Sequence, residues 1–137
     1  MERNEKTAGN VTDMEINSFE DLDAWKLARE LRKKISLVVK KFPKEETYSL
    51  VDQMKRASRS ATANIAEGHG RFHYQDNIRF CRQSKGSLYE LIDHSITAHD
   101  EGFISDAEFE ETKALVLRTI KTLNGYIRYL NRRKKEE

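Results

Sequence analysis

The fold is decided by Gln53-Met-Lys-Arg-Ala-Ser-Arg-Ser-Ala-Thr-Ala-Asn-Ile-Ala-Glu-Gly68, which has the periodicity of a helix with two stripes. At 100° per residue, an arc of about 80° holds an apolar seam of mostly small side chains, Leu50, Met54, Ala57, Ala61 and Ile65. The neighbouring arc of about 80° holds a polar stripe, Gln53, Arg56, Ser60, Asn64 and Glu67. Two regular stripes require a partner, which is another helix of the chain, another subunit or a ligand.

The composition around this stretch favours a single all-α domain. The chain has 137 residues, which is enough for one domain with its own core. One proline and six glycines favour long helices over sheet and turns. Cys81 is the only cysteine, so an intramolecular disulfide is excluded. Because the sequence shows no signal-peptide core and no 18-residue apolar run, we expect a cytoplasmic protein without a membrane partner.

Helix signals extend outward from this stretch in both directions. They predict helices at about 19–42, 46–68, 74–100 and 106–133. Ser18 is the expected N-cap of the first helix, which ends at Phe42-Pro43. A capping box from Ser105 to Glu108 opens the fourth. Four helices with short connections predict an antiparallel up-down-up-down bundle over 18–133, between a flexible polar leader at 1–17 and a charged tail at 134–137.

Three positions carry more specific expectations about packing. Gly68 is the expected left-handed stop of the second helix. Gly86 lies inside the third helix, where glycine costs about 1 kcal/mol against alanine, so it predicts close approach by a neighbouring backbone. Ile96 is expected on the inward face of the same helix.

Basic stripes are the best functional signal in the residues themselves. Residues 24–135 hold 23 basic and 14 acidic side chains, a net charge near +9, which attracts polyanions. Two helix faces and the start of the tail concentrate this charge, with Lys26, Arg29, Lys33 and Lys40 on the first helix and Arg118, Lys121, Arg128, Arg132 and Arg133 on the fourth. Such rows predict contacts to nucleic-acid phosphates, and a solvated helix face is the competing interpretation. No aromatic platform is expected between them, so recognition would depend on backbone and shape.

The remaining polar residues favour architecture over chemistry. The stripe Gln53, Arg56, Ser60, Asn64 and Glu67 could line a ligand pocket, but a hydrogen-bonded contact between helices or subunits is the favoured interpretation. His69 and His73 are four residues apart, but Gly70 lies between them, so a shared metal face is not expected. Cys81 is expected in the core. We find no catalytic motif and expect no enzyme, no metal and no cofactor.

Residues spread over all four predicted helices match the pattern of a known family. They are Phe19, Leu22, Trp25, Ala28, Leu31, Phe42-Pro43, Glu46, Tyr48, Leu50, Gln53, Arg56-Ala57, Ser60, Asn64-Ile-Ala-Glu-Gly68, Ser84, Gly86, Ser87, Leu88, Glu90-Leu91, Leu123, Gly125, Ile127 and Leu130. Through these residues the sequence resembles the 23S rRNA intervening-sequence protein family, bacterial four-helix-bundle proteins, and the resemblance covers the whole bundle. Arg59, Ala61 and Thr62 depart from it, because the family commonly has two apolar residues and a proline there.

The resemblance implies a homopentameric ring without known catalytic activity. Relatives with a similar bundle are basic accessory subunits of the reverse transcriptase in diversity-generating retroelements. We therefore expect a non-enzymatic oligomeric scaffold that binds structured RNA or DNA through its basic faces, in the manner of an accessory to a nucleic-acid enzyme. The alternative is a protein–protein assembly module without a nucleic-acid role, whose partner is another polypeptide.

Overall fold

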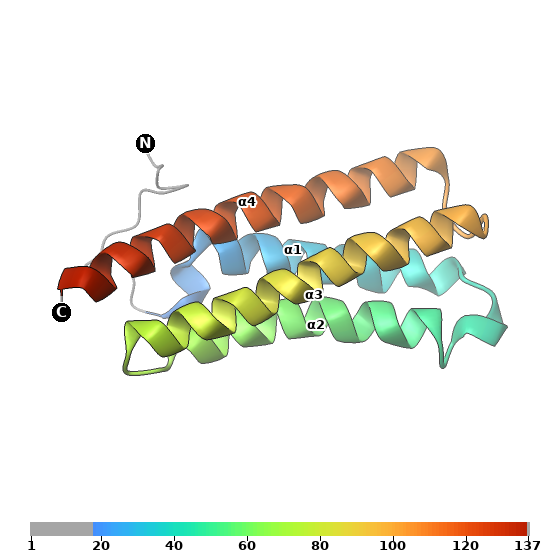
Figure 1. Cartoon of the computed structure of the whole chain (residues 1–137). Helices are drawn as coiled ribbons and strands as arrows, with labels where there is room; N and C mark the ends of the chain where they lie inside the picture. Colours follow the sequence, from blue (N-terminus) through green and yellow to red (C-terminus); the bar gives the residue numbers. More distant parts are fainter. Residues whose placement is uncertain (1–17, 137) are drawn as a thin grey trace.

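The computed structural model describes residues 18–136, which form an all-α bundle without strands. Four long helices lie side by side along one axis (Figure 1). They are α1 (Asp23–Val38), α2 (Leu50–His69), α3 (Tyr74–Asp100) and α4 (Asp106–Glu136). Residues pack between α1 and α2, α2 and α3, α3 and α4, and α1 and α4. The predicted leader at 1–17 lies outside the described residues.

The bundle has two ends with different connections (Figure 1). One end carries the α2–α3 connection and the carboxy-terminal turns of α4, and the other carries the α1–α2 and α3–α4 connections. The core between them is mainly aliphatic, with some buried aromatic and polar side chains, and its largest fully buried members include Leu31, Met54, Ile65, Leu88 and Leu123. The predicted apolar seam of α2 is buried along its whole length.

The first two predicted helices begin differently from expectation. Ser18 does act as an N-cap, but of the 3-10 helix η2 (Phe19–Asp21), where it forms a capping box with Asp21. The chain then turns at Leu22, which is 2% exposed, before α1 starts. The prediction of one continuous helix from residue 19 is therefore wrong, because burial of the Leu22 side chain redirects the chain between η2 and α1.

Both ends of the α1–α2 connection also contain a short 3-10 helix. Residues Val39–Lys41 form η3 after α1, and Lys44–Glu46 form η4 before α2. The Glu46 carboxylate accepts hydrogen bonds from the Ser49 hydroxyl, at 2.7 Å, and from the Leu50 N–H, at 3.3 Å. It therefore caps α2 from outside, and α2 begins at Leu50 instead of 46.

Neither Gly68 nor Gly86 has the role expected of it. Gly68 is not a left-handed stop, because α2 continues to His69 and Gly102, φ 78°, is the only glycine with positive φ among residues 18–136. A Cβ on Gly68 would lie 2.7 Å from Asn77 Oδ1 and 2.9 Å from Phe80 Cβ. The close approach of helices predicted at Gly86 occurs here, whereas a Cβ on Gly86 would meet nothing within 4 Å.

The other expectations for α3 and α4 are met in part. The capping box at Ser105 is present, with Glu108 N–H donating to Ser105 Oγ and Ser105 N–H to Glu108 Oε1. Ile96 is 41% exposed, so its predicted inward position is wrong. The predicted tail is helical through Glu136. Within it, Lys134 Nζ donates a hydrogen bond to Gln75 Oε1 on α3 at 2.7 Å. Basic residues also suit the negative end of a helix dipole, which favours this extension.

Candidate nucleic-acid interface

The predicted basic stripe of the first helix is exposed in the structure. Its members are Lys26, Arg29 and Lys33 on α1 and Lys40 on η3. None of the four has an ion pair within residues 18–136, whereas their neighbours Lys34 and Lys41 pair with Glu111 and Glu108 on α4. The chain thus neutralises the lysines that face α4 and leaves the outward ones available to an external anion.

A groove of about 180 Å³ between α1 and α2 continues this stripe. It is lined by Arg32, Lys33, Ser36, Lys55, Ser58 and Arg59, which is four cations and two hydroxyls without a carboxylate. The Arg32 guanidinium donates to Thr62 Oγ1 on α2 at 3.1 Å, and this bond orients it across the groove. We call this feature the α1–α2 groove.

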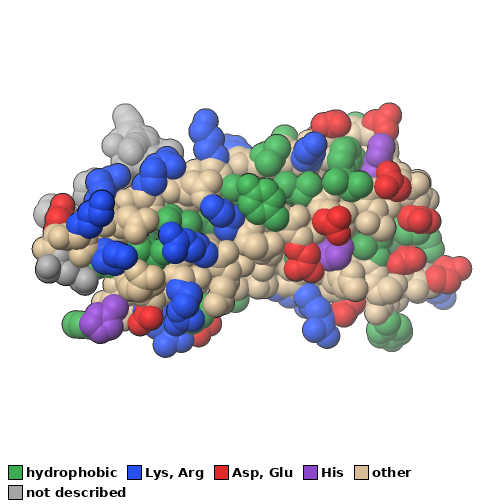
Figure 2. Space-filling model, viewed as in Figure 1, with side chains coloured by type: hydrophobic (Ala, Val, Ile, Leu, Met, Phe, Trp, Pro, Cys, Tyr) green, Lys and Arg blue, Asp and Glu red, His purple; other side chains and the backbone are tan. Residues whose placement is uncertain are grey.

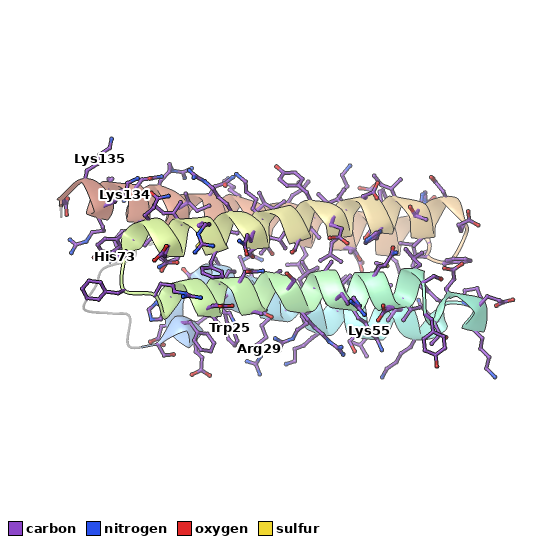
Figure 3. The ribbon with its side chains drawn as sticks, turned by 60° about the horizontal axis from the view of Figure 1, so that its bottom comes forward. Trp25, Arg29, Lys55, His73, Lys134 and Lys135 are labelled. Atoms are coloured by element: carbon purple, nitrogen blue, oxygen red, sulfur yellow. The ribbon has the colours of Figure 1, made fainter. Side chains whose placement is uncertain are left out.

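Stripe and groove form one surface because Lys33 belongs to both. At 100° per residue, the order around the α1 axis is Arg32, Ser36, Arg29, Lys33 and Lys26, over an arc of about 120°. In Figure 3, Trp25 and Arg29 of α1 and Lys55 of α2 lie along the lower side of the bundle. Arg29 also lies over the Trp25 ring, with its Cζ 5.9 Å from the ring centroid.

The second predicted stripe runs along α4. Arg118, Lys121, Arg128 and Arg132 are exposed, but Arg133 is only partly so. Arg133 Nε donates to the Tyr74 hydroxyl at 3.4 Å, and its NH1 lies 3.2 Å from Glu136 Oε1. Arg133 therefore helps to hold α4 against the start of α3, and it differs in this from the other four members of the predicted set.

Charge is distributed unevenly along the length of the bundle on the face that Figure 2 shows. Figure 2 shows Lys and Arg gathered over one end and Asp and Glu over the other. The basic end, with the α2–α3 connection, carries exposed Arg71, Arg79, Arg82, Arg128, Arg132, Lys134 and Lys135. The acidic end, with the α3–α4 connection, carries Glu90, Asp93, Asp100, Glu101, Asp106 and Glu110.

The polar stripe of α2 is not a single contact. Ser60 lies at the α2–α3 interface, where Ser87 Oγ donates to its hydroxyl at 2.9 Å. Asn64 Nδ2 bonds back to Ser60 on the same helix. Arg56 and Glu67 form exposed ion pairs one turn away, with Asp52 and Arg71, and Gln53 is exposed. The predicted contact between helices is thus observed for Ser60. A contact of Gln53, Arg56 and Glu67 with another subunit stays a prediction.

Neither the thiol nor the histidines form a reactive cluster within the described part of the chain. Cys81 is fully buried and its Sγ donates to Asn77 Oδ1 at 3.5 Å. Burial raises the pKa of the Cys81 thiol from its ordinary value to about 12. No three His, Cys, Asp or Glu side chains among residues 18–136 are grouped to hold a metal ion.

Several basic residues of these surfaces were missed at the sequence level. Arg32, Lys55 and Arg59 complete the α1–α2 groove, and Arg79 and Arg82 enlarge the basic end. Lys55 and Arg59 are four residues apart on α2, so the arc calculation applied to its two stripes could have found them. Their closeness to Arg32 depends on how α1 packs on α2, which no single-helix periodicity contains.

A family model matches most of the chain. Residues 20–125 match the model of a family described as 23S rRNA-intervening sequence protein. The chain belongs to this family. The matched range contains α1, α2 and α3 with the whole α1–α2 groove, but it stops before Arg128, Arg132 and Arg133 of α4. No curated protein sequence matches the chain. No helix within residues 18–136 is long and apolar enough to cross a membrane.

Proposed function

We propose that this protein is a non-enzymatic scaffold that binds structured RNA or DNA through the phosphate backbone, at the α1–α2 groove and the basic stripe beside it. The groove is the observation that carries the proposal. Four cations from two helices line one small volume, and no carboxylate lines it with them. Arginine and lysine placed together in this way repel one another until an anion binds between them.

Phosphate, with its charge and several acceptor oxygens, fits this arrangement of cations. Arg32 and Arg59 can each donate two parallel hydrogen bonds to phosphate oxygens, and the Lys33 and Lys55 ammonium groups add point charge. The row Lys26, Arg29 and Lys33 can neutralise successive phosphates beside the groove, because their side chains follow one another along an exposed helix face. Such contacts position a backbone without reading its bases.

Membership of the family supports RNA as the nucleic acid. The family's description refers to sequences that interrupt 23S rRNA, so an RNA-related role is the simplest one for this chain. The groove lies within the matched residues, which fits a function that belongs to the family fold. In this proposal the protein has no catalytic step of its own and serves as an accessory to a nucleic-acid enzyme, such as a retroelement reverse transcriptase.

The proposal includes an antiparallel up-down-up-down bundle and assembly of copies into a homopentameric ring. Short connections at alternate ends support the antiparallel order. Exposed apolar side chains support assembly, and Figure 2 shows them gathered over α3 and α4 between the two charged ends. Tyr89 and Ile96, one heptad apart on α3, are 53% and 41% exposed, and Leu117 on α4 is 45% exposed. The same strip favours the second candidate function, a module that binds only protein.

Salt dependence of binding tests the proposal. We would measure the affinity for a structured RNA by fluorescence anisotropy from about 50 to 200 mM salt, in the wild type and in the double variant Lys33→Gln with Lys55→Gln. The expected result is weaker binding and a logarithmic salt slope that is smaller by about one for each phosphate that the variant no longer neutralises.

A matched control removes the same charge elsewhere. The double variant Lys34→Gln with Lys41→Gln changes two lysines that already pair with Glu111 and Glu108, so its salt slope should stay near that of the wild type. Equal losses of affinity in both double variants would mean that only net charge matters, and this would contradict binding at the α1–α2 groove. If the protein binds neither RNA nor DNA at about 50 mM salt, the nucleic-acid function is excluded and the module that binds only protein remains.

A further inference from the structure

A second cavity lies at the basic end of the bundle and differs in chemistry from the α1–α2 groove. It has a volume of about 200 Å³ and is lined by His69, Arg71, Phe72, His73, Tyr74, Asn77, Tyr126, Tyr129 and Leu130. Aromatic and imidazole rings therefore make up most of its wall. Drug-sized ligands usually occupy about 300 Å³ or more, so this cavity has room for one small ring system.

Phe72 is the most unusual residue of this cavity. Its side chain is 92% exposed, although a phenylalanine ring normally contributes to a core. The rings of Phe72 and His73 meet edge to face, with centroids 4.8 Å apart and planes at 85°. Phe72 therefore offers an open aromatic face at the mouth of the cavity, with the edge of the His73 ring beside it.

Cations lie at the same end of the bundle as this aromatic face. Arg71 precedes Phe72, and its guanidinium is held by Glu67, at 2.9 Å, and over the Phe80 ring, at 4.7 Å. Lys134 is fixed nearby on α4 by its bond to Gln75 on α3. Figure 3 shows His73, Lys134 and Lys135 at the same end of the bundle. Aromatic faces between cations are the usual features of sites for unpaired nucleotides, where bases stack on rings and cations contact the backbone.

We propose that this end cavity binds one unpaired base of an RNA strand, which stacks on Phe72 while Lys134 and Lys135 contact the adjoining phosphates. The inference rests on the proposed nucleic-acid function and adds a preference for single-stranded segments. Because every base has an aromatic face, the site favours unpaired over paired nucleotides without choosing a sequence.

A single-stranded RNA containing 2-aminopurine, and the same strand in a duplex, would test the proposal. Moving 2-aminopurine from its neighbouring bases onto Phe72 should change its fluorescence when the wild-type protein binds the single strand. We expect Phe72→Ala to weaken single-strand binding about tenfold and to remove this fluorescence change, with duplex affinity changed less than about twofold. Phe72→Trp should retain both signals because it keeps an aromatic face.

Tyr48 provides the matched control. It is 93% exposed and lies in the α1–α2 connection at the opposite end, so Tyr48→Ala should change neither affinity. Both residues are exposed, and circular dichroism should report folded protein in every variant. Unchanged single-strand binding in Phe72→Ala, or an equal loss of affinity for duplex, overturns the inference and leaves the proposed function standing. Failure of the wild type to bind either RNA overturns both.

Discussion

At the scale of single residues, the contrast between Gly68 and Gly86 gives a direct test of the packing. Gly68→Ala should lower the free energy of unfolding by about 1–3 kcal/mol, because its Cβ would push against Asn77 and Phe80 of α3. Asn77 cannot move freely, since its Nδ2 donates to the Tyr126 hydroxyl at 3.1 Å.

Gly86→Ala should have the opposite effect, a gain of about 0.5–1 kcal/mol, because a Cβ there meets nothing within 4 Å and alanine favours a helix interior. Denaturant unfolding of both variants measures the two changes. A loss of stability in Gly86→Ala together with a smaller native mass would place another copy of the chain against this part of α3.

The Cys81 thiol should be unreactive in the folded protein. With its pKa raised to about 12 by burial, it stays protonated at pH 8, and the thiolate is the reactive form. A chromogenic disulfide reagent at pH 8 should label Cys81 only after unfolding in guanidinium. Fast labelling of folded protein would contradict the buried position.

The sign of the associated pH effect follows from the same pKa. As the pH rises from about 9 towards about 12, the thiol of the unfolded chain loses its proton and the folded one keeps it. Ionisation then favours the unfolded state, so this group lowers stability over that range and has no effect on stability below it.

At the scale of elements, sequence periodicity predicts the long helices because each buries one regular stripe. The apolar seam of α2 and the capping box of α4 are local patterns, and both are present. Helix starts are less predictable where burial of one side chain redirects the chain. Leu22 interrupts the first helix by entering the core, a tertiary effect that propensity cannot contain.

The candidate site, like the helices, is predictable from sequence only where it depends on spacing along a single helix. The stripes on α1 and α4 follow from spacing along one helix, so Lys33 and Arg118 can be identified from sequence alone. The α1–α2 groove needs the pairing of two helices, and the end cavity needs a connection folded against α4. Neither the contact of Arg32 with Thr62 nor the exposure of Phe72 is encoded in a periodic pattern.

At the scale of the whole molecule, the exposed strip on α3 predicts assembly. Ile96→Ser should reduce the native mass of the particle, measured by native mass spectrometry or light scattering, because it removes an apolar contact from the proposed interface. Leu37→Ser is the control, since Leu37 is also exposed, at 64%, but lies on α1. A wild-type protein that is already monomeric would contradict the proposed ring.

The opposite charges of the two ends give the bundle an electric dipole along its length. A polyanion therefore exerts a torque on the molecule before any contact forms and turns the end with the α2–α3 connection towards itself. The acidic end points away at that moment, and repulsion from the same polyanion discourages the reverse approach. This orientation would act only over short separations, because charges farther apart than one Debye length, about 8 Å at physiological salt, are largely screened.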